Sequence, residues 1–259
     1  MPRQVYVLGI DFSLHMPLLA HSTESFIQMT ETFAFIATIP GREAALQRCV
    51  ESLRPQVDGV CVFYDKHGDP NAHVQRVFVS EYRYGDRGDG AKFYWLQREM
   101  PEMHNPFVLV CDDDLEYPPD YAVTMKKHRD RSPGLVGVSG AIIAPDATTY
   151  RRHRKSFHCL QAHDDYTPVN VLGTGTLAGY WYEIASLVRD VDFTDPPNVA
   201  DLHLAVSAQT HQRKLTVVPR TKDWLTYLLP PDAPTIWSAG ELEREARMVQ
   251  RVSPWKVFS

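Results

Sequence analysis

Three consecutive carboxylates, Asp112, Asp113 and Asp114, are the residues whose type and spacing most directly suggest chemistry. Five apolar residues at 107–111 precede them, and two prolines break the chain a few residues later. A short apolar run bounded by a turn signal predicts a buried strand. Adjacent carboxylates raise one another's pKa unless a cation is present, and Mg²⁺ or Mn²⁺ takes carboxylate oxygens while leaving positions for phosphates. The triplet therefore predicts a divalent-cation site at a strand end; the alternative is a solvated acidic turn.

The elements before the triplet would bring other polar groups to the same end of a sheet. Residues 33–39 form a predicted strand ended by a Pro-Gly pair, 42–53 a helix with one apolar face, and 59–64 a second strand followed by Asp65. Short strand–helix–strand connections predict a parallel pair with a right-handed crossover. Open α/β sheets bind ligands at the carboxyl ends of their strands. We therefore expect Asp65 and the turn at 38–42 to share one edge with the triplet.

The rest of the chain predicts a single α/β domain over 1–259. We treat 1–31 as an N-terminal extension and 226–259 as a C-terminal tail that could act as a lid. The patterns predict further strands at 5–10, 71–80, 135–143, 169–172 and 215–218, and helices at 91–100, 119–131, 199–212 and 239–252.

Two glycine-containing segments are candidates for close contact with a ligand. Residues 85–90 include Arg87 and lead into Lys92 at the start of a predicted helix. Such a loop can bind phosphate through its backbone N–H groups, although it could equally be a plain turn. The second segment holds Gly173, Thr174 and Gly175, where missing side chains allow close backbone approach or merely a bulge.

Asp201 is a further candidate site residue. It lies in the first turn of the predicted helix 199–212, which Asn198 is expected to cap. Helical spacing puts it on the same face as Leu204 and Ala208. The pattern therefore favours a carboxylate aimed into a site, and the alternative is a surface acid stabilised by the helix dipole.

Two basic runs could contact an anionic partner. The run at 126–129 ends a predicted helix, where positive charge complements the helix dipole. The run at 150–155 is expected in a loop, and it could contact an anionic acceptor such as nucleic acid. Our acceptor candidates are Arg151, Arg152, Arg154, Lys155 and Trp224.

The composition is that of an ordinary soluble globular protein. Of the 259 residues, 44% are hydrophobic and 23% are charged, and the net charge of -5 provides no general attraction to nucleic acid or anionic membranes. The four cysteines are scattered without a paired motif, which favours reduced core residues and a cytoplasmic protein. No stretch approaches the roughly 20 apolar residues of a membrane span.

Taken together, the strand–helix–strand opening, FVLVCDDD and NVADLHLA resemble the nucleotide-sugar-dependent glycosyltransferases of the GT-A fold. The resemblance covers roughly residues 33–225 and is nearest to the inverting family-2 type, in particular to bacterial and phage-type sequences. It implies a Rossmann-like α/β fold with a mixed, mostly parallel central sheet flanked by helices. It also implies transfer of a sugar from a nucleotide diphosphate, with a UDP-sugar expected, to an acceptor hydroxyl with the help of Mn²⁺ or Mg²⁺.

The resemblance also implies roles for individual residues. Asp65 would contact the uracil, Asp112 would point towards the ribose, Asp114 would be a metal ligand together with Asp112, and Asp201 would be the general base. Ala200 departs from the family, which usually carries a glutamate before that aspartate. The expected donor-binding set is Thr38, Pro40, Arg42, Asp65, Arg87, Lys92, Asp112, Asp113, Gly173, Thr174 and Gly175.

Two other classes of protein stay open. A nucleotidyltransferase acting on sugar phosphates also uses metal-bound carboxylates on an α/β sheet, but its basic, glycine-rich phosphate loop is lacking at 38–42. A non-catalytic module that binds sugar or nucleic acid is the other alternative. The identities of the sugar and the acceptor, and the choice between an inverting and a retaining reaction, do not follow from the sequence.

Overall fold

A computed structural model describes residues 31–66, 81–98, 105–152, 154–230, 233 and 242–259. The predicted strands at 5–10 and 71–80 lie outside these ranges, as does the N-terminal extension except for its last residue. The description below concerns the described residues.

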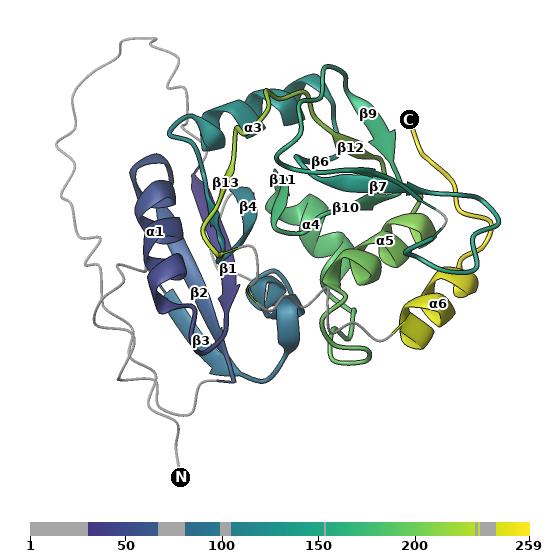
Figure 1. The fold of residues 1–259 in the computed structure, drawn as a ribbon, viewed down its shortest axis with the longest axis horizontal. Helices are drawn as coiled ribbons and strands as arrows, with labels where there is room; N and C mark the ends of the chain where they lie inside the picture. Colours follow the sequence, from purple (N-terminus) through teal and green to yellow (C-terminus); the bar gives the residue numbers. More distant parts are fainter. Residues whose placement is uncertain (1–30, 67–80, 99–104, 153, 231–232, 234–241) are drawn as a thin grey trace, which may run out of the picture.

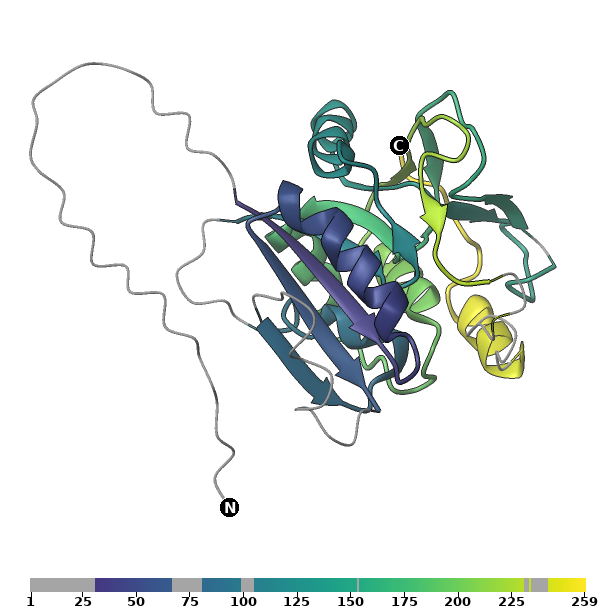
Figure 2. The ribbon, with the colours of Figure 1, turned by 60° about the vertical axis from the view of Figure 1, so that its left-hand side comes forward.

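One large sheet forms the centre of the fold (Figures 1 and 2). In the described ranges its eight strands lie side by side in this order: β3 (Glu81–Gly85), β2 (Gly59–Asp65), β1 (Thr32–Thr38), β4 (Phe107–Asp112), β11 (Thr176–Tyr180), β6 (Leu135–Gly137), β12 (Leu215–Val217) and β9 (Thr167–Val169). The first four strands are parallel, β11 is antiparallel to both β4 and β6, and β12 is parallel to β6. This confirms the expected mixed, mostly parallel sheet.

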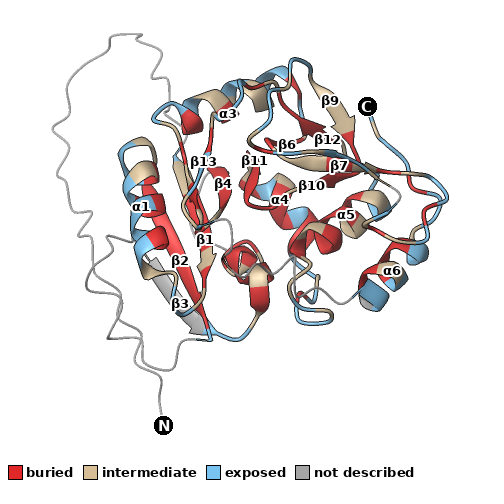
Figure 3. Ribbon diagram, in the orientation of Figure 1, coloured by how far each residue is buried: buried red, intermediate tan, exposed pale blue. Residues whose placement is uncertain are grey.

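Helices cover both faces of this sheet. One face packs against α1 (Glu43–Leu53), the short 3₁₀ turn η1 (Arg54–Gln56) and α3 (Tyr121–Arg131), and the other against the 3₁₀ helix η2 (Gly88–Phe93), α4 (Trp181–Val188) and α5 (Ala200–Thr210). Successive side chains of each strand point to opposite faces of the sheet, so an apolar core forms on each face. The buried residues concentrate along these contacts (Figure 3).

The first strand–helix–strand unit forms as predicted. The helix α1 buries Leu46, Cys49, Val50 and Leu53, the face given by the apolar spacing. In register, Thr38 pairs with Tyr64 and Ala37 with Asp112. The carboxyl ends of β1, β2 and β4 therefore meet at one edge, which confirms the expected placement of Asp65 and the triplet.

The predicted strand at 135–143 is two strands in different sheets, which corrects that prediction. After β6 the chain leaves the large sheet, and β7 (Gly140–Ile143) joins a small sheet with β8 (Arg154–Phe157) and β10 (Val171–Leu172). The hydroxyl of Thr176 accepts the N–H groups of Val138 and Ser139 at the break. The strand expected at 169–172 divides in the same way, because Asn170 separates β9 from β10.

The sequence patterns missed β11 and α4. Strand β11 reads TLAGY, and alanine and glycine are depleted in strands, so its propensity is weak. A Cβ added at Gly179 would lie 2.6 Å from a methyl group of Leu135. Close packing between neighbouring strands therefore determines this central element rather than local preference.

The helix predicted at 91–100 is a 3₁₀ helix over Gly88–Phe93 followed by turns to Arg98, and 99–104 lie outside the described residues. Phe193 packs closely against this segment: a Cβ added at Gly90 would lie 2.3 Å from the Cβ of Phe193. The helix predicted at 199–212 is confirmed as α5, but Asn198 does not cap it through its side chain. Instead, the carboxylate of Asp89 accepts the N–H of Ala200 at 3.0 Å.

The C-terminal residues return to the body of the protein. Strand β13 (Thr226–Tyr227) pairs with β5 (Leu115–Glu116) beside the acidic triplet. The helix predicted at 239–252 is described as α6 (Leu242–Arg251), which packs on α5. Among the described helices, none has the length and apolar character needed to cross a membrane.

Candidate active site

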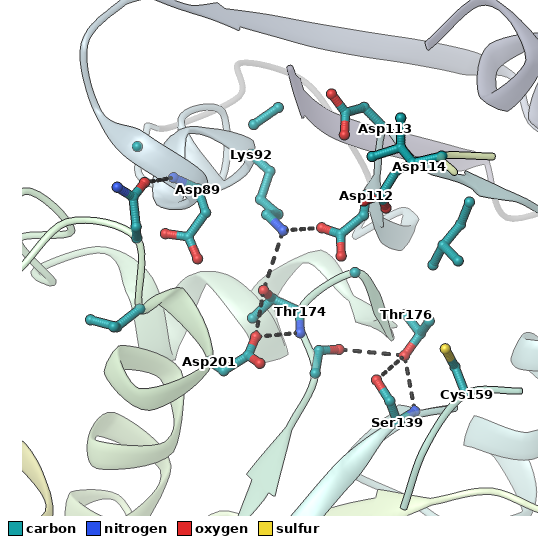
Figure 4. Close-up of a pocket in the computed structure, with 18 of the residues that line it drawn as sticks. Asp89, Lys92, Asp112, Asp113, Asp114, Ser139, Cys159, Thr174, Thr176 and Asp201 are labelled. Atoms are coloured by element: carbon teal, nitrogen blue, oxygen red, sulfur yellow. Dashed lines mark hydrogen bonds and ion pairs between the residues drawn. The ribbon is translucent and has the colours of Figure 1, made fainter. Parts of the chain in front are cut away.

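A cavity of about 970 Å³ opens at the carboxyl edge of the parallel strands (Figure 4). Its wall combines residues from β1, β2 and β4 with residues from η2, the 173–176 segment, α5 and α6. The predicted donor-side residues line it together, except Arg87, whose guanidinium instead contacts the Gln97 side chain at 3.1 Å.

Asp113 is the anchor of the triplet. Its carboxylate accepts hydrogen bonds from the Thr38 hydroxyl at 2.6 Å and the Arg42 guanidinium at 2.7 Å. Burial raises the pKa of Asp113, and the contacts with Arg42 and Thr38 oppose that rise. Asp113 therefore ties the triplet to the end of β1 and leaves its two neighbours to face the cavity.

Asp114 is an acid whose ionisation its surroundings disfavour. The Arg42 guanidinium reaches it at 3.3 Å. Burial, followed by the charges of Asp112 and Asp113, nevertheless raises its pKa to about 7. A further cation beside Asp114 would relieve this repulsion.

A chain of polar contacts runs from Asp112 across the cavity floor to Asp201 (Figure 4). The Lys92 ammonium donates to the Asp112 carboxylate and, at 3.3 Å, to the Thr174 hydroxyl. That hydroxyl donates to Asp201 Oδ1 at 2.8 Å, and the Thr174 N–H donates to the same oxygen at 2.7 Å. Burial alone would lower the pKa of Lys92, but the charges of Asp112 and Asp89 outweigh it and the pKa rises. Lys92 is therefore a fixed cation between two carboxylates.

Asp65 lies at the end of β2 with a nearly buried side chain. Its Oδ1 accepts the Arg87 N–H at 2.5 Å, whereas the buried Oδ2 has no hydrogen-bond partner within the part of the chain that the structure describes. Burial raises the pKa of this carboxyl, and the Arg87 N–H opposes the rise. Asp65 thus belongs to the cavity wall with a carboxylate that is almost closed to solvent.

The glycines of the 173–176 segment are required by contacts within the protein. A Cβ added at Gly175 would lie 1.9 Å from the Asp112 carboxylate, and one at Gly173 would lie 2.1 Å from the Ser139 hydroxyl. These glycines hold the segment against the triplet, which leaves Thr174 positioned between Lys92 and Asp201.

Asp201 faces the cavity from the first turn of α5. Burial raises its pKa, whereas the hydrogen bonds from Thr174 and the charge of Lys92 lower it. Burial is thus the larger effect, and it makes the carboxylate a stronger base than an exposed aspartate. Both hydrogen bonds from Thr174 end on Oδ1, which fixes that oxygen against the 173–176 segment.

The residues present fit a hard divalent cation in part. Asp112 and Asp114 supply carboxylate oxygens. Burial and the neighbouring carboxylates raise the pKa of Asp114, and a bound cation would counteract that rise. No group of three or more His, Cys, Asp or Glu suited to a metal occurs among the described residues. A cation here would therefore need oxygens from a ligand or from water, as Mg²⁺ commonly does in phosphate sites.

The acceptor candidates divide into two groups. Arg151 and Arg154 line the cavity, and Arg151 is bound to Glu245 of α6. Arg152, Lys155 and Trp224 do not line it; the Trp224 indole N–H donates to Asp120 at 3.3 Å. Arg154 and Lys155 belong to β8, which corrects the loop expected there.

Sequence reasoning did not single out several residues of the cavity wall, namely Asp89, Ser139, Tyr150 and Glu245. Asp89 lies in the glycine-rich loop and could have been noted as its buried acid. Glu245 had no local signal, because its role depends on Arg151, 94 residues earlier.

Comparison with known proteins supports the fold. A scan against protein-family models finds no match, and a search of curated proteins finds none either. Among solved structures, the chain is similar to GalNAc-T7 crystallised with UDP, GalNAc and Mn²⁺, with a TM-score of 0.61 and 9% sequence identity. The alignment covers 86% of this chain and 48% of that one, so the present chain spans about half the length of its structural neighbour. The likeness confirms the expected GT-A type of α/β fold.

Proposed function

We propose that the protein is a metal-dependent glycosyltransferase that moves a sugar from a nucleotide diphosphate, expected to be UDP, to an acceptor hydroxyl. The observation that carries the proposal is the convergence of Asp112, Asp114 and Asp201 on one cavity, joined through Lys92 and Thr174. The same cavity thus holds two carboxylates that could bind a metal with the donor's phosphates, Asp112 and Asp114, and a candidate base, Asp201. Sugar transfer requires both functions in one site.

The donor would bind along the ends of β1, β2 and β4. Asp65 would contact the base, because it lines the cavity at the end of β2. Thr38, Pro40 and Arg42 would border the nucleoside, and Lys92 would lie near the diphosphate. A metal held by Asp112 and Asp114 would supply the positive charge that neutralises the leaving diphosphate.

Asp201 would act as the general base. Thr174 holds Oδ1 through two hydrogen bonds, which orients Oδ2 to take the proton of an acceptor hydroxyl. Its raised pKa would strengthen the base, and the nearby cation Lys92 keeps that rise limited so that the group can still ionise. A base on the acceptor side favours inversion, with the hydroxyl attacking opposite the leaving group.

The test is a screen of UDP-sugars and GDP-sugars with Mn²⁺, with thermal shift measuring binding and release of the nucleotide measuring turnover. We expect metal-dependent stabilisation by one donor class and slow hydrolysis of that donor. Binding without any hydrolysis would favour a non-catalytic module, and release of pyrophosphate from a nucleoside triphosphate and a sugar phosphate would favour a nucleotidyltransferase.

A further inference from the structure

The cavity wall has a second part, made of residues that belong neither to the triplet nor to the proposed donor-binding set. Four of its residues are Tyr150, Arg151, Arg154 and Glu245, and we call them the α6 wall because Glu245 comes from that helix. Tyr150 and Arg151 lie between β7 and β8 of the small sheet, and Arg154 is the first residue of β8, so two separate segments of the chain build this wall.

An ion pair forms the centre of the α6 wall. The Arg151 guanidinium donates twice to the Glu245 carboxylate, at 3.0 and 2.7 Å. Glu245 is only 3% exposed. A buried ion pair is weak support for stability because desolvation offsets its attraction. Moreover, α6 is already held by the apolar Met248 and Val249, which belong to the same buried cluster as Leu202 of α5. The pair is therefore better explained by what it presents to the cavity.

The α6 wall and the proposed base, Asp201, line the same cavity. Burial raises the pKa of the Tyr150 phenol, the charge of Asp201 raises it further, and Arg154 lowers it. The Arg154 guanidinium lies 4.2 Å from the centre of the Tyr150 ring. A ligand on this wall would thus have its hydroxyl groups in the same cavity as Asp201.

The charges of this region balance. Arg151 is paired with Glu245, and Arg154 and Asp201 line the same cavity. Recognition of a polyanion relies on excess positive charge. Within the cavity the predicted basic run provides only Arg151, which Glu245 neutralises, and Arg154, because Arg152 and Lys155 lie outside the cavity. A carboxylate, a guanidinium fork and a phenol together offer both acceptors and donors of hydrogen bonds.

We infer that the α6 wall is the acceptor subsite and that it takes an uncharged, hydroxyl-rich ring, that is, a sugar residue, in preference to nucleic acid. The inference rests on the proposed glycosyl transfer. It assigns Glu245 and Arg151 to hydrogen bonding with the acceptor's hydroxyl groups, and Tyr150 to positioning the ring beside Asp201.

The variant Glu245→Gln tests this directly, because it removes the charge and keeps the shape. Glu243→Gln is the matched control, since Glu243 is exposed in the first turn of the same helix. With a panel of neutral methyl glycosides as acceptors, we expect kcat/KM for transfer to fall about 10–100-fold in Glu245→Gln, as for loss of a charged hydrogen bond. Donor hydrolysis without acceptor should stay within about twofold of the parent, and the control should match the parent in both assays.

A binding measurement separates this inference from the proposed function. Ligand-observed NMR with the same glycosides needs no turnover, so it remains decisive if no nucleotide sugar is hydrolysed. We expect binding to the parent and to Glu243→Gln, and loss of binding in Glu245→Gln and Tyr150→Phe. Thermal melting confirms that each variant folds. No glycoside binding by the parent would overturn the inference, as would transfer to single-stranded or duplex oligonucleotides that weakens steeply with salt.

Discussion

Asp114 is the side chain in the cavity with the clearest need for a cation, because burial and two neighbouring carboxylates raise its pKa to about 7. We predict that Asp114→Asn abolishes Mn²⁺-dependent binding of UDP while the protein still folds. Glu116→Gln is the control, since Glu116 is a surface acid two residues away that pairs with Arg48. Isothermal titration with Mn²⁺ and again with EDTA measures the effect. Equal UDP affinity of the parent under both conditions would contradict the metal assignment.

Asp201 is predicted to act on the chemical step rather than on donor binding. Asp201→Asn keeps the size and can still accept the Thr174 hydrogen bonds, but it cannot take a proton. Positioned general-base catalysis is typically worth about 10²–10⁴-fold, so transfer should fall by that factor. The Kd for the donor, measured by titration, should change little. If donor binding were lost and the rate of transfer kept, Asp201 would have a structural role, and Asp192 or Asp195 would become the candidate base.

At the scale of elements, Asp89 joins η2 to α5 and so connects the segments that carry Lys92 and Asp201. Its carboxylate accepts the Ala200 N–H, and its own N–H donates to the Asn198 side chain at 3.3 Å. Burial raises its pKa to about 6. The protonated form is therefore favoured in the folded protein, and this contribution to stability is full below the unfolded pKa of 3.8 and is lost as pH rises through about 6.

We predict that Asp89→Asn flattens this part of the pH dependence and keeps the cap on α5. The pKa difference corresponds to at most about 3 kcal/mol in the free energy of unfolding. Asp89→Ala should instead destabilise by about 1–2 kcal/mol, because the Ala200 N–H loses its acceptor. Urea unfolding between pH 4 and 7 measures both. Asp86→Asn, an exposed change in the same loop, is the control; a parent curve with the same slope as that of Asp89→Asn would refute the prediction.

At the scale of the whole molecule, the C-terminal residues are part of the body rather than a loose tail. Trp255 is 2% exposed and donates its indole N–H to the Val249 carbonyl at 2.8 Å. It belongs to the cluster that unites α6, the small sheet and α5. Removing it should therefore weaken the wall that carries Glu245 as well as the fold.

We predict that Trp255→Ala lowers the free energy of unfolding by about 3–5 kcal/mol, the usual cost of such a truncation in a core. Val257→Ala, at an exposed position two residues later, should change it little. Denaturant unfolding followed by circular dichroism measures both. A small effect of Trp255→Ala would indicate that the C-terminal segment detaches without loss of the core.

Local patterns in the sequence were sufficient for the features that depend on near neighbours. The apolar run before the triplet, the single apolar face of α1, and the placement of Asp65 and Asp112 at one sheet edge followed from periodicity and short connections. The strength of these signals comes from burial on a regular element, which repeats at fixed intervals along the chain.

Only the tertiary structure decided which distant residues meet. Thr174 joins Lys92, 82 residues before it, to Asp201, 27 residues after it, and Arg151 loses its availability to a polyanion because Glu245 pairs with it from 94 residues away. The division of 135–143 between two sheets likewise depends on the Thr176 hydroxyl. Such contacts produce no periodic pattern in the sequence. The stability of a strand and the ionisation of a charged group depend on neighbours that are distant in the chain and become adjacent only in the folded protein.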